Sequence, residues 1–155
     1  MPQPRFLTHL LSALTLGLAA LPAQAEEVGR IGVDWVGNDI VVEAVADPGV
    51  QGVTCYLTYF DRSVYDRLSN GNWFEDPSNS AISCAQTGPI TIGEIAKGPK
   101  GERIFSASRS LILKSLRVTR IWDEANGVLL YVAHANEVTE GSAKMALSVV
   151  PVGKN

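Results

Sequence analysis

The apolar residues of this chain gather in short runs, rich in β-branched and aromatic side chains, that are separated by turn residues. Residues 39–45 (DIVVEAV) and 53–60 (VTCYLTYF) each predict a strand. The DPGVQG segment between them has the length of a hairpin connection, with Pro48 outside the hydrogen-bonded ladder. We therefore expect these two strands to pair antiparallel.

A second hairpin is predicted in the other half of the chain. Residues 111–122 (LILKSLRVTRIW) and 128–135 (VLLYVAHA) are two further apolar runs. They flank Asn126 and Gly127, a dipeptide that accepts the positive φ angles of a tight turn. This is the clearest pairing signal in the sequence.

Two shorter strands and two helical segments complete the predicted elements. Residues 81–86 (AISCAQ) and 146–152 (ALSVVPV) predict the strands, the second of which Pro151 places at a sheet edge or ends. A short helix is expected within residues 88–98, and residues 62–68 fit one or two helical turns. The pattern predicts a mainly β (α+β) fold: a single antiparallel sheet, curled or folded into a sandwich or an open barrel, with one or two short helices.

The first residues have the features of an export signal. They begin with the charge of Arg5, continue with an apolar run over residues 6–21, and end in Ala23-Gln24-Ala25, the small-x-small pattern that signal peptidase recognises. The run is shorter than the roughly 20 apolar residues of a membrane span. We expect residues 1–25 to be a cleaved signal peptide and residues 26–155 to form a single β-rich domain that does not span the membrane.

Charge and cysteine content narrow the classes of function. The chain has a formal net charge of -3, which argues against nucleic acid as a partner because phosphate binding usually needs a strongly basic surface. Cys55 and Cys84 are its two cysteines, and in an oxidising compartment we expect them to form a structural disulfide. They lack the close spacing of redox-active thiols, and two free thiols are the alternative.

A polar segment inside the expected disulfide loop carries aromatic residues. Residues 61–80 include Tyr65, Trp73 and Phe74, and long loops in small domains are often functional. These three residues are candidates for a binding rim that holds an envelope protein or a small ligand. The alternative is a surface excursion that Trp73 and Phe74 anchor in the core.

Basic residues gather around one predicted strand: Arg109, Lys114, Arg117 and Arg120. Alternation places Lys114 and Arg120 on one face and Arg117 and Arg109 on the other. Such charges most often protect a sheet edge from association. The alternative is a bulge near Lys114 that brings Lys114, Arg117 and Arg120 together as an anion-binding patch.

Catalytic and metal-binding patterns are weak. His134 is the one histidine after residue 25, and no Gly-x-Ser-x-Gly motif is present. We expect His134 to be a hydrogen-bonded residue near a strand end rather than a catalytic base. Asp61, Asp66, Glu75 and Asp76 match no calcium-loop spacing and fit a solvated loop. We expect neither a metal nor a cofactor.

Several ordered blocks of the sequence resemble the CreA family of exported bacterial proteins. The blocks include Val53-Thr54-Cys55-Tyr56, Ser80-Ala81-Ile82-Ser83-Cys84, Lys114-Ser115-Leu116 and Thr139-Glu140-Gly141-Ser142. The resemblance extends from about residue 26 to residue 152. It implies a periplasmic protein in which the two cysteines recur, whose biochemical activity is unassigned, and which offers no catalytic residues to transfer.

These observations favour a non-enzymatic binding or envelope-associated protein. The rival interpretation is a hydrolase of an envelope carbohydrate or ester, using carboxylates such as Glu43, Glu75 or Asp76. Two acids that converge in a cleft would favour the enzyme. Exposed side chains of the aromatic segment would favour a partner-binding surface.

Overall fold

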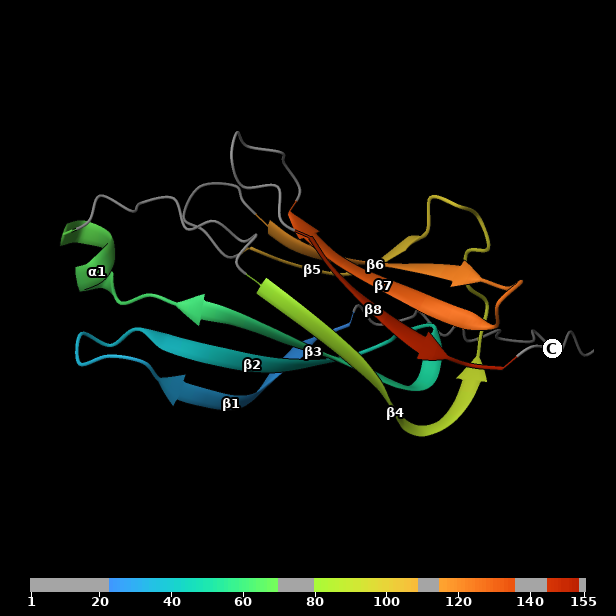
Figure 1. The fold of residues 1–155 in the computed structure, drawn as a ribbon, viewed down its shortest axis with the longest axis horizontal. Coiled ribbons are helices and arrows are strands. Elements are labelled where there is room, and N and C mark those ends of the chain that lie inside the picture. The colour runs from blue at the N-terminus through green and yellow to red at the C-terminus, as the bar shows by residue number, and fades with distance from the viewer. Residues whose placement is uncertain (1–22, 70–79, 109–114, 136–144, 154–155) are drawn as a thin grey trace, which may run out of the picture.

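The computed structural model describes residues 23–69, 80–108, 115–135 and 145–153. Within these residues the elements are β1 (Ala25–Gly32), β2 (Asp39–Ala46), β3 (Val50–Asp61), α1 (Val64–Ser69), β4 (Ser80–Ile92), β5 (Glu102–Ser108), β6 (Ser115–Asp123), β7 (Val128–Ala135) and β8 (Met145–Pro151). The strands form two antiparallel sheets, in the orders β1-β2-β3-β4 and β5-β6-β7-β8 (Figure 1). The predicted mainly β fold is confirmed. The expected sandwich consists of two packed sheets rather than one sheet folded over itself.

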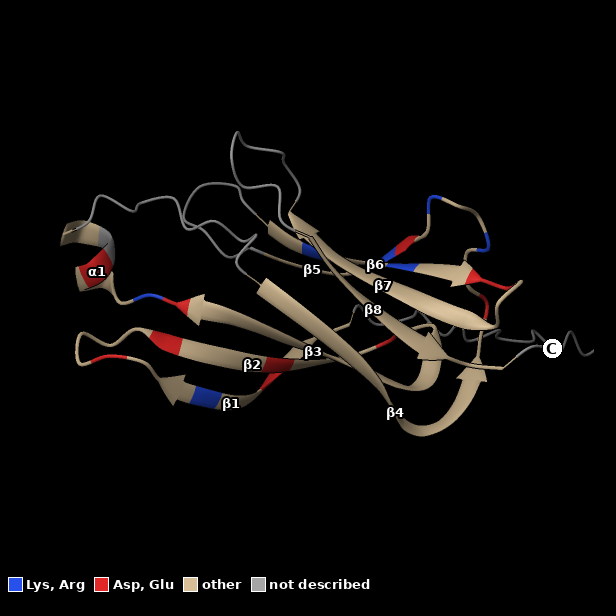
Figure 2. Ribbon diagram, viewed as in Figure 1, with Lys and Arg blue, Asp and Glu red and all other residues tan. Residues whose placement is uncertain are grey.

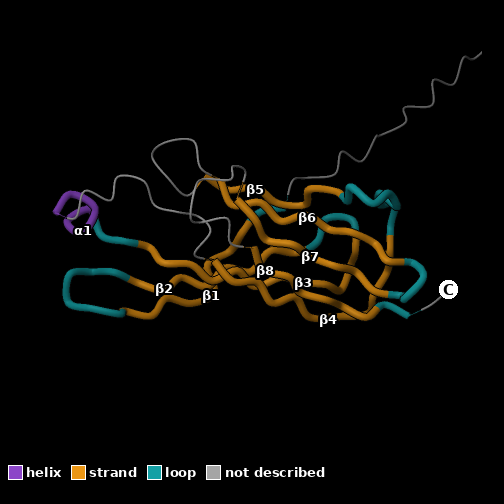
Figure 3. Tube along the Cα trace, turned by 45° about the horizontal axis from the view of Figure 1, so that its top comes forward, coloured by secondary structure: helices purple, strands orange, loops and turns teal. Residues whose placement is uncertain are grey.

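The core lies between the two sheets. Alternate residues of β3, β6 and β7 point into it, so that Leu57, Leu116 and Leu129 are at most 1% exposed. β4 and β8 contact each other along one side of the sandwich (Figure 3), where the backbone N–H of Cys84 donates to Ser148 Oγ at 2.8 Å. On the other side β1 and β5 are the edge strands of their sheets.

Both predicted hairpins are confirmed. β2 pairs antiparallel with β3, and Pro48 lies in the turn between them, outside the ladder. β6 pairs antiparallel with β7 through a turn in which Gly127 has a φ of 66°. β8 is an edge strand of its sheet and ends at Pro151, as expected.

The helical predictions have two outcomes. The turns expected over residues 62–68 are confirmed as α1. The helix expected within residues 88–98 is wrong, because β4 continues to Ile92, which pairs with Val50 of β3. Beyond it, residues 93–101 form an irregular segment whose Ile95 packs against the core. Strand pairing and core contacts therefore outweigh the local apolar spacing.

Two strands, β1 and β5, were not predicted. β1 has the sequence AEEVGRIG, whose two large apolar residues, Val28 and Ile31, are exposed. β5 has the sequence ERIFSAS and carries a register shift between Arg103 and Phe105, which lets both Ile104 and Phe105 be buried. Neither sequence alternates cleanly, which is why periodicity alone does not reveal these strands.

A tight backbone approach at Gly52 gives the first testable prediction. Gly52 has a φ of 78° at the register shift between Gln51 and Val53 of β3, and a Cβ added there would lie 2.3 Å from the carbonyl oxygen of Pro89. Gly52→Ala should therefore lower the free energy of unfolding by about 2–3 kcal/mol in a denaturant titration. The control is Gly29→Ala in β1, where an added Cβ meets nothing within 4 Å. Equal stability of the two variants would contradict this description of β3.

Candidate functional site

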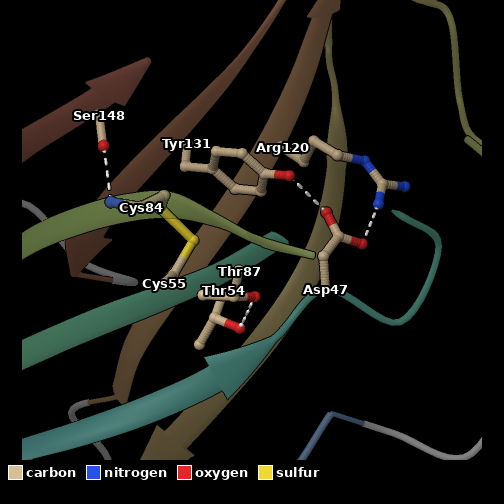
Figure 4. Close-up of a disulfide and its surroundings, with 8 residues drawn as sticks. All are labelled: Asp47, Thr54, Cys55, Cys84, Thr87, Arg120, Tyr131 and Ser148. Carbon is tan, nitrogen blue, oxygen red and sulfur yellow. Dashed lines mark hydrogen bonds and ion pairs between the residues drawn. A yellow bond between two sulfur atoms is a disulfide. The ribbon is translucent and has the colours of Figure 1, made fainter. Parts of the chain in front are cut away.

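The two cysteines form the expected disulfide between β3 and β4 (Figure 4). Cys55 and Cys84 are directly opposite each other in the strand register, with Cα atoms 3.9 Å apart. Cys55 is 0% exposed and Cys84 is 9% exposed. The bond closes a segment that includes α1, with 29 residues of sequence separation, and its burial is that of a structural crosslink.

A buried ion pair links the β2–β3 turn to the second sheet. Asp47 follows β2, and Oδ1 of its carboxylate accepts hydrogen bonds from the backbone N–H groups of Gly49 and Val50, at 2.8 and 3.1 Å. The same oxygen accepts a hydrogen bond from Nη1 of Arg120, which β6 places on the inner face. The side chain of Arg120 is 2% exposed and that of Asp47 is 0% exposed. This charge pair joins the two sheets within the core.

Tyr131 completes the coordination of the buried carboxylate. Its hydroxyl donates to Asp47 Oδ2 at 2.7 Å (Figure 4), and the residue is 0% exposed. Burial, followed by the hydrogen bond and the charge of Asp47, raises the pKa of Tyr131 well above its ordinary value. Tyr131 therefore remains a protonated hydrogen-bond donor and does not serve as a base.

The irregular segment after β4 covers this network. Glu102 Oε2 accepts from Arg120 Nη2 at 2.5 Å and from the backbone N–H of Ala96 at 3.3 Å. A Cβ added to Gly49 would lie 2.9 Å from both Arg120 Nη1 and Ile95 Cγ2. The guanidinium is therefore enclosed by protein atoms, so the network stabilises the fold and is not a site for an external ligand.

The described members of the predicted anion patch do not lie together. Arg117 and Arg120 lie on opposite faces of β6, and Lys114 and Arg109 lie outside the described residues. β6 is an inner strand of its sheet, between β5 and β7, so the prediction that these charges protect a sheet edge is wrong for Arg117 and Arg120. Arg120 is a core residue because Asp47 and Glu102 supply its counter-charges.

A second polar cluster lies on the inner face of the first sheet, where β2 and β3 extend beyond the second sheet (Figures 1 and 2). Arg30 of β1 forms ion pairs with Glu27, Asp39 and Asp61, at 2.8, 3.0 and 2.9 Å. Arg30 is opposite the buried Val41 in the register, which places the cluster on the inner face. The hydrogen bond from Arg30 lowers the pKa of Glu27, and the three carboxylates raise that of Arg30.

The carboxylates proposed for a hydrolase are only partly described. Glu43 of β2 is opposite Glu27 of β1, and its Oε1 accepts from the Tyr59 hydroxyl at 2.8 Å. Glu75 and Asp76 lie outside the described residues. The acid nearest to Glu43 in register, Glu27, has its pKa lowered by Arg30, whereas a general acid for glycoside cleavage needs a raised one.

His134 of β7 has the environment of a structural residue. Its Nε2 lies 3.0 Å from Thr119 Oγ1 and its Nδ1 lies 2.8 Å from the carbonyl oxygen of Ala135. Across the described ranges, no three or more His, Cys, Asp or Glu side chains are grouped so that they could hold a metal ion. No helix among the same residues combines the length and the apolar character that crossing a membrane requires.

Five exposed apolar side chains gather at one end of the molecule. We call this the aromatic end, and it comprises Val33, Trp35, Val64, Tyr65 and Leu68, which are 51%, 94%, 72%, 69% and 55% exposed. Figures 1 and 3 show the β1–β2 loop and α1 together at this end. Of the predicted binding rim, Tyr65 is exposed here, whereas Trp73 and Phe74 lie outside the described residues. Trp35 was not predicted, although its place between Asp34 and the Gly37-Asn38 turn indicated a loop.

Hydrogen bonds fix the loop that presents Trp35. Asp34 Oδ1 accepts from the backbone N–H groups of Val36 and Asn38, at 3.1 and 3.0 Å, and the bond from Asn38 lowers the pKa of Asp34. Asn38 Oδ1 in turn accepts from the backbone N–H of Ser63, just before α1, at 3.0 Å. The β1–β2 loop and α1 are therefore directly connected and form one surface.

Comparison with known proteins identifies relatives along almost the whole chain. The family model described as CreA protein matches residues 28–155. Protein CreA of Escherichia coli strain K12 is 41% identical over 151 residues, which cover 93% of this chain and 94% of the relative, and the proteins of the same name from strains O6:H1 and O157:H7 match equally well. No solved structure matches. The chain therefore belongs to the CreA family.

Proposed function

We propose that this protein is a non-enzymatic, periplasmic, envelope-associated binding protein whose binding surface is the aromatic end. The supporting observation is Trp35, which is 94% exposed at the end of the molecule where Tyr65 of α1 is also exposed. Large exposed apolar groups on a small domain typically mark an interaction surface, and tryptophan and tyrosine are enriched at the residues that dominate binding energy.

The surroundings of Trp35 are those of a preorganised surface. Because the bonds from Asp34 and Asn38 hold the loop against Ser63, little conformational entropy is lost when a partner covers it. Trp35 projects into solvent, so the pocket that receives it must belong to the partner. This favours an envelope protein over a small ligand as the partner.

Periplasmic location is part of the same proposal. It is supported by the signal-peptide features of residues 1–25 and by the disulfide, a bond that forms and persists in oxidising compartments. Fractionation of cells followed by mass spectrometry tests it directly. A periplasmic product that begins near Glu26 supports the proposal, and a cytoplasmic product that retains residues 1–25 contradicts it.

Capture of a partner tests the binding surface. Immobilised mature protein is incubated with a detergent-solubilised envelope extract, in parallel with the Trp35→Ala variant and a Val28→Ala control. Val28 is another exposed apolar residue, 53% exposed, outside the aromatic end. We expect a partner that the parent protein and the control retain and that Trp35→Ala loses at least tenfold, about 1.4 kcal/mol or more of binding free energy.

The stability of the Trp35→Ala variant has to be measured alongside. Because Trp35 is almost fully exposed, its removal should change the free energy of unfolding by less than about 0.5 kcal/mol. A partner retained equally by all three proteins, or a hydrolytic activity in purified mature protein, would contradict the proposal.

A further inference from the structure

We infer that the outer face of the second sheet docks on an anionic phospholipid surface. We call it the basic apolar face, and it comprises Arg103, Arg117, Met145, Leu147 and Val149. It lies on a different sheet from the aromatic end and is independent of the function proposed there.

The strand register brings these residues to one face. Arg103 is opposite Thr119 and Arg117 is opposite His134, on the side of β6 that faces away from the buried Arg120. On β8, the side chains of Met145, Leu147 and Val149 alternate with those that point toward the core. Since β7 places Val132 between Thr119 and Leu147, the basic and apolar residues form one continuous surface.

The apolar part of this face is unusually exposed for a strand in a small domain. Met145 is 73% exposed, Leu147 is 60% exposed and Val149 is 48% exposed. Three consecutive outward positions of one strand are therefore apolar and open to solvent. A surface of this kind stabilises contact with the boundary between lipid headgroups and acyl chains.

Charge complementarity selects the kind of surface. Neither Arg103 nor Arg117 has a carboxylate partner among the described residues, and Arg117 Nε is a buried donor with no hydrogen-bond partner there. Two acids of this sheet are engaged elsewhere: Glu102 of β5 accepts a hydrogen bond from Arg120, and Asp123, the last residue of β6, accepts hydrogen bonds from Asn126. Within a chain of net charge -3, this face is locally basic and attracts anionic headgroups.

The aromatic end lacks this charge pattern. The charges around it are of both signs, since Arg30 pairs with Asp39 and Asp61 and Arg62 pairs with Asp66, so nothing there favours anionic lipid. The two exposed apolar surfaces of the molecule therefore differ in the partner that their charges favour.

Vesicle sedimentation tests the inference with the purified mature protein. The probes are vesicles of phosphatidylcholine and vesicles of phosphatidylcholine mixed with phosphatidylglycerol. We expect binding to the anionic vesicles alone, and raising the ionic strength from about 0.1 to about 1 M should weaken it because the Debye length falls from about 10 to about 3 Å. This salt dependence requires no variant.

Two substitutions then locate the contact. Arg103→Glu should lower the partition coefficient by about fivefold or more, and Leu147→Ser by about tenfold. Val28→Ser is the matched control, on a strand of the other sheet, and should bind as the parent protein does. The melting curves of all variants should superimpose, since the three side chains are exposed.

Several results would overturn the inference. They are equal binding to neutral and anionic vesicles, no binding to either, or an equal fall in the partition coefficient of the Val28→Ser and Leu147→Ser variants. A dimer in light scattering that Leu147→Ser converts to monomer would show that a second copy of the chain, and not lipid, covers this face. A Trp35→Ala variant that no longer binds the partner of the aromatic end should still bind vesicles. The two proposals can therefore fail separately.

Discussion

An Arg120→Met variant should have a free energy of unfolding about 3–5 kcal/mol lower than that of the parent protein, measured by denaturant titration at neutral pH. Methionine occupies a similar volume, so the main change is loss of the positive charge beside Asp47. The Asp47 carboxylate, 0% exposed, would keep its bonds from Tyr131 and from the turn backbone but lose its counter-ion. In a domain of this size the midpoint of thermal unfolding should fall by about 10–20 °C.

The control for Arg120→Met is Arg103→Met, an exposed arginine of the same sheet. That substitution should change the free energy of unfolding by about 0.5 kcal/mol or less. A double-mutant cycle with Asp47→Asn then measures the coupling between the two charges, which should exceed about 1 kcal/mol. A loss from Arg120→Met no larger than that from Arg103→Met would show that the ion pair does not hold the two sheets together.

Reduction of the Cys55–Cys84 bond should lower the free energy of unfolding by about 3.5 kcal/mol. Closing a loop of this length removes roughly that amount of conformational freedom from the unfolded chain, on the loop-entropy model. The native pairing of β3 with β4 leaves the two cysteines opposite each other with or without the bond. The effect should therefore appear in stability rather than in the binding activity of folded protein.

The disulfide prediction is measured by comparing denaturation of oxidised and reduced protein. The Cys55→Ala/Cys84→Ala double variant is the control, since its stability should not respond to reductant. Coincident curves for oxidised and reduced parent protein would contradict the assignment of the bond as a structural crosslink. A new or lost chemical activity on reduction would do the same.

Much of the fold could be predicted because its hairpins are encoded locally. The β-branched runs of β2 and β3, and the Asn126-Gly127 turn between β6 and β7, each carry their own pairing signal. The edge strands β1 and β5 have weaker patterns, because one is largely solvent-exposed and the other contains a bulge. The apolar cluster within residues 88–98 predicts a helix, but local spacing does not show that Ile92 pairs with β3 and that Ile95 packs against the core.

The buried network could be predicted only in part. Alternation predicts that Arg120 shares one face of its strand with Lys114, and in β6 that face also carries the buried Leu116 and Val118, but the predicted role of Arg120 was edge protection. What made it a core residue is Asp47, 73 positions earlier, and nothing local links the two. The exposure of Trp35 is likewise set by the tertiary fold, since a loop tryptophan is equally compatible with core anchoring.

The proposed account gives this small domain two separate binding surfaces. The disulfide and the Asp47–Arg120 pair stabilise a sandwich of two sheets. The aromatic end is formed by the β1–β2 loop of the first sheet together with α1, whereas the basic apolar face belongs to the second sheet. In the proposed account, the first surface binds a protein and the second contacts lipid. Each surface can be altered by exposed substitutions that leave the core intact.

Cross-linking in living cells tests the central claim, that the aromatic end binds a partner. A photoreactive benzoylphenylalanine replaces Tyr65, and in a parallel strain it replaces Val28, before the cells are irradiated. The account predicts one discrete adduct from position 65, absent from position 28 and abolished by Trp35→Ala. No adduct from position 65, or one that persists in the Trp35→Ala background, would contradict it.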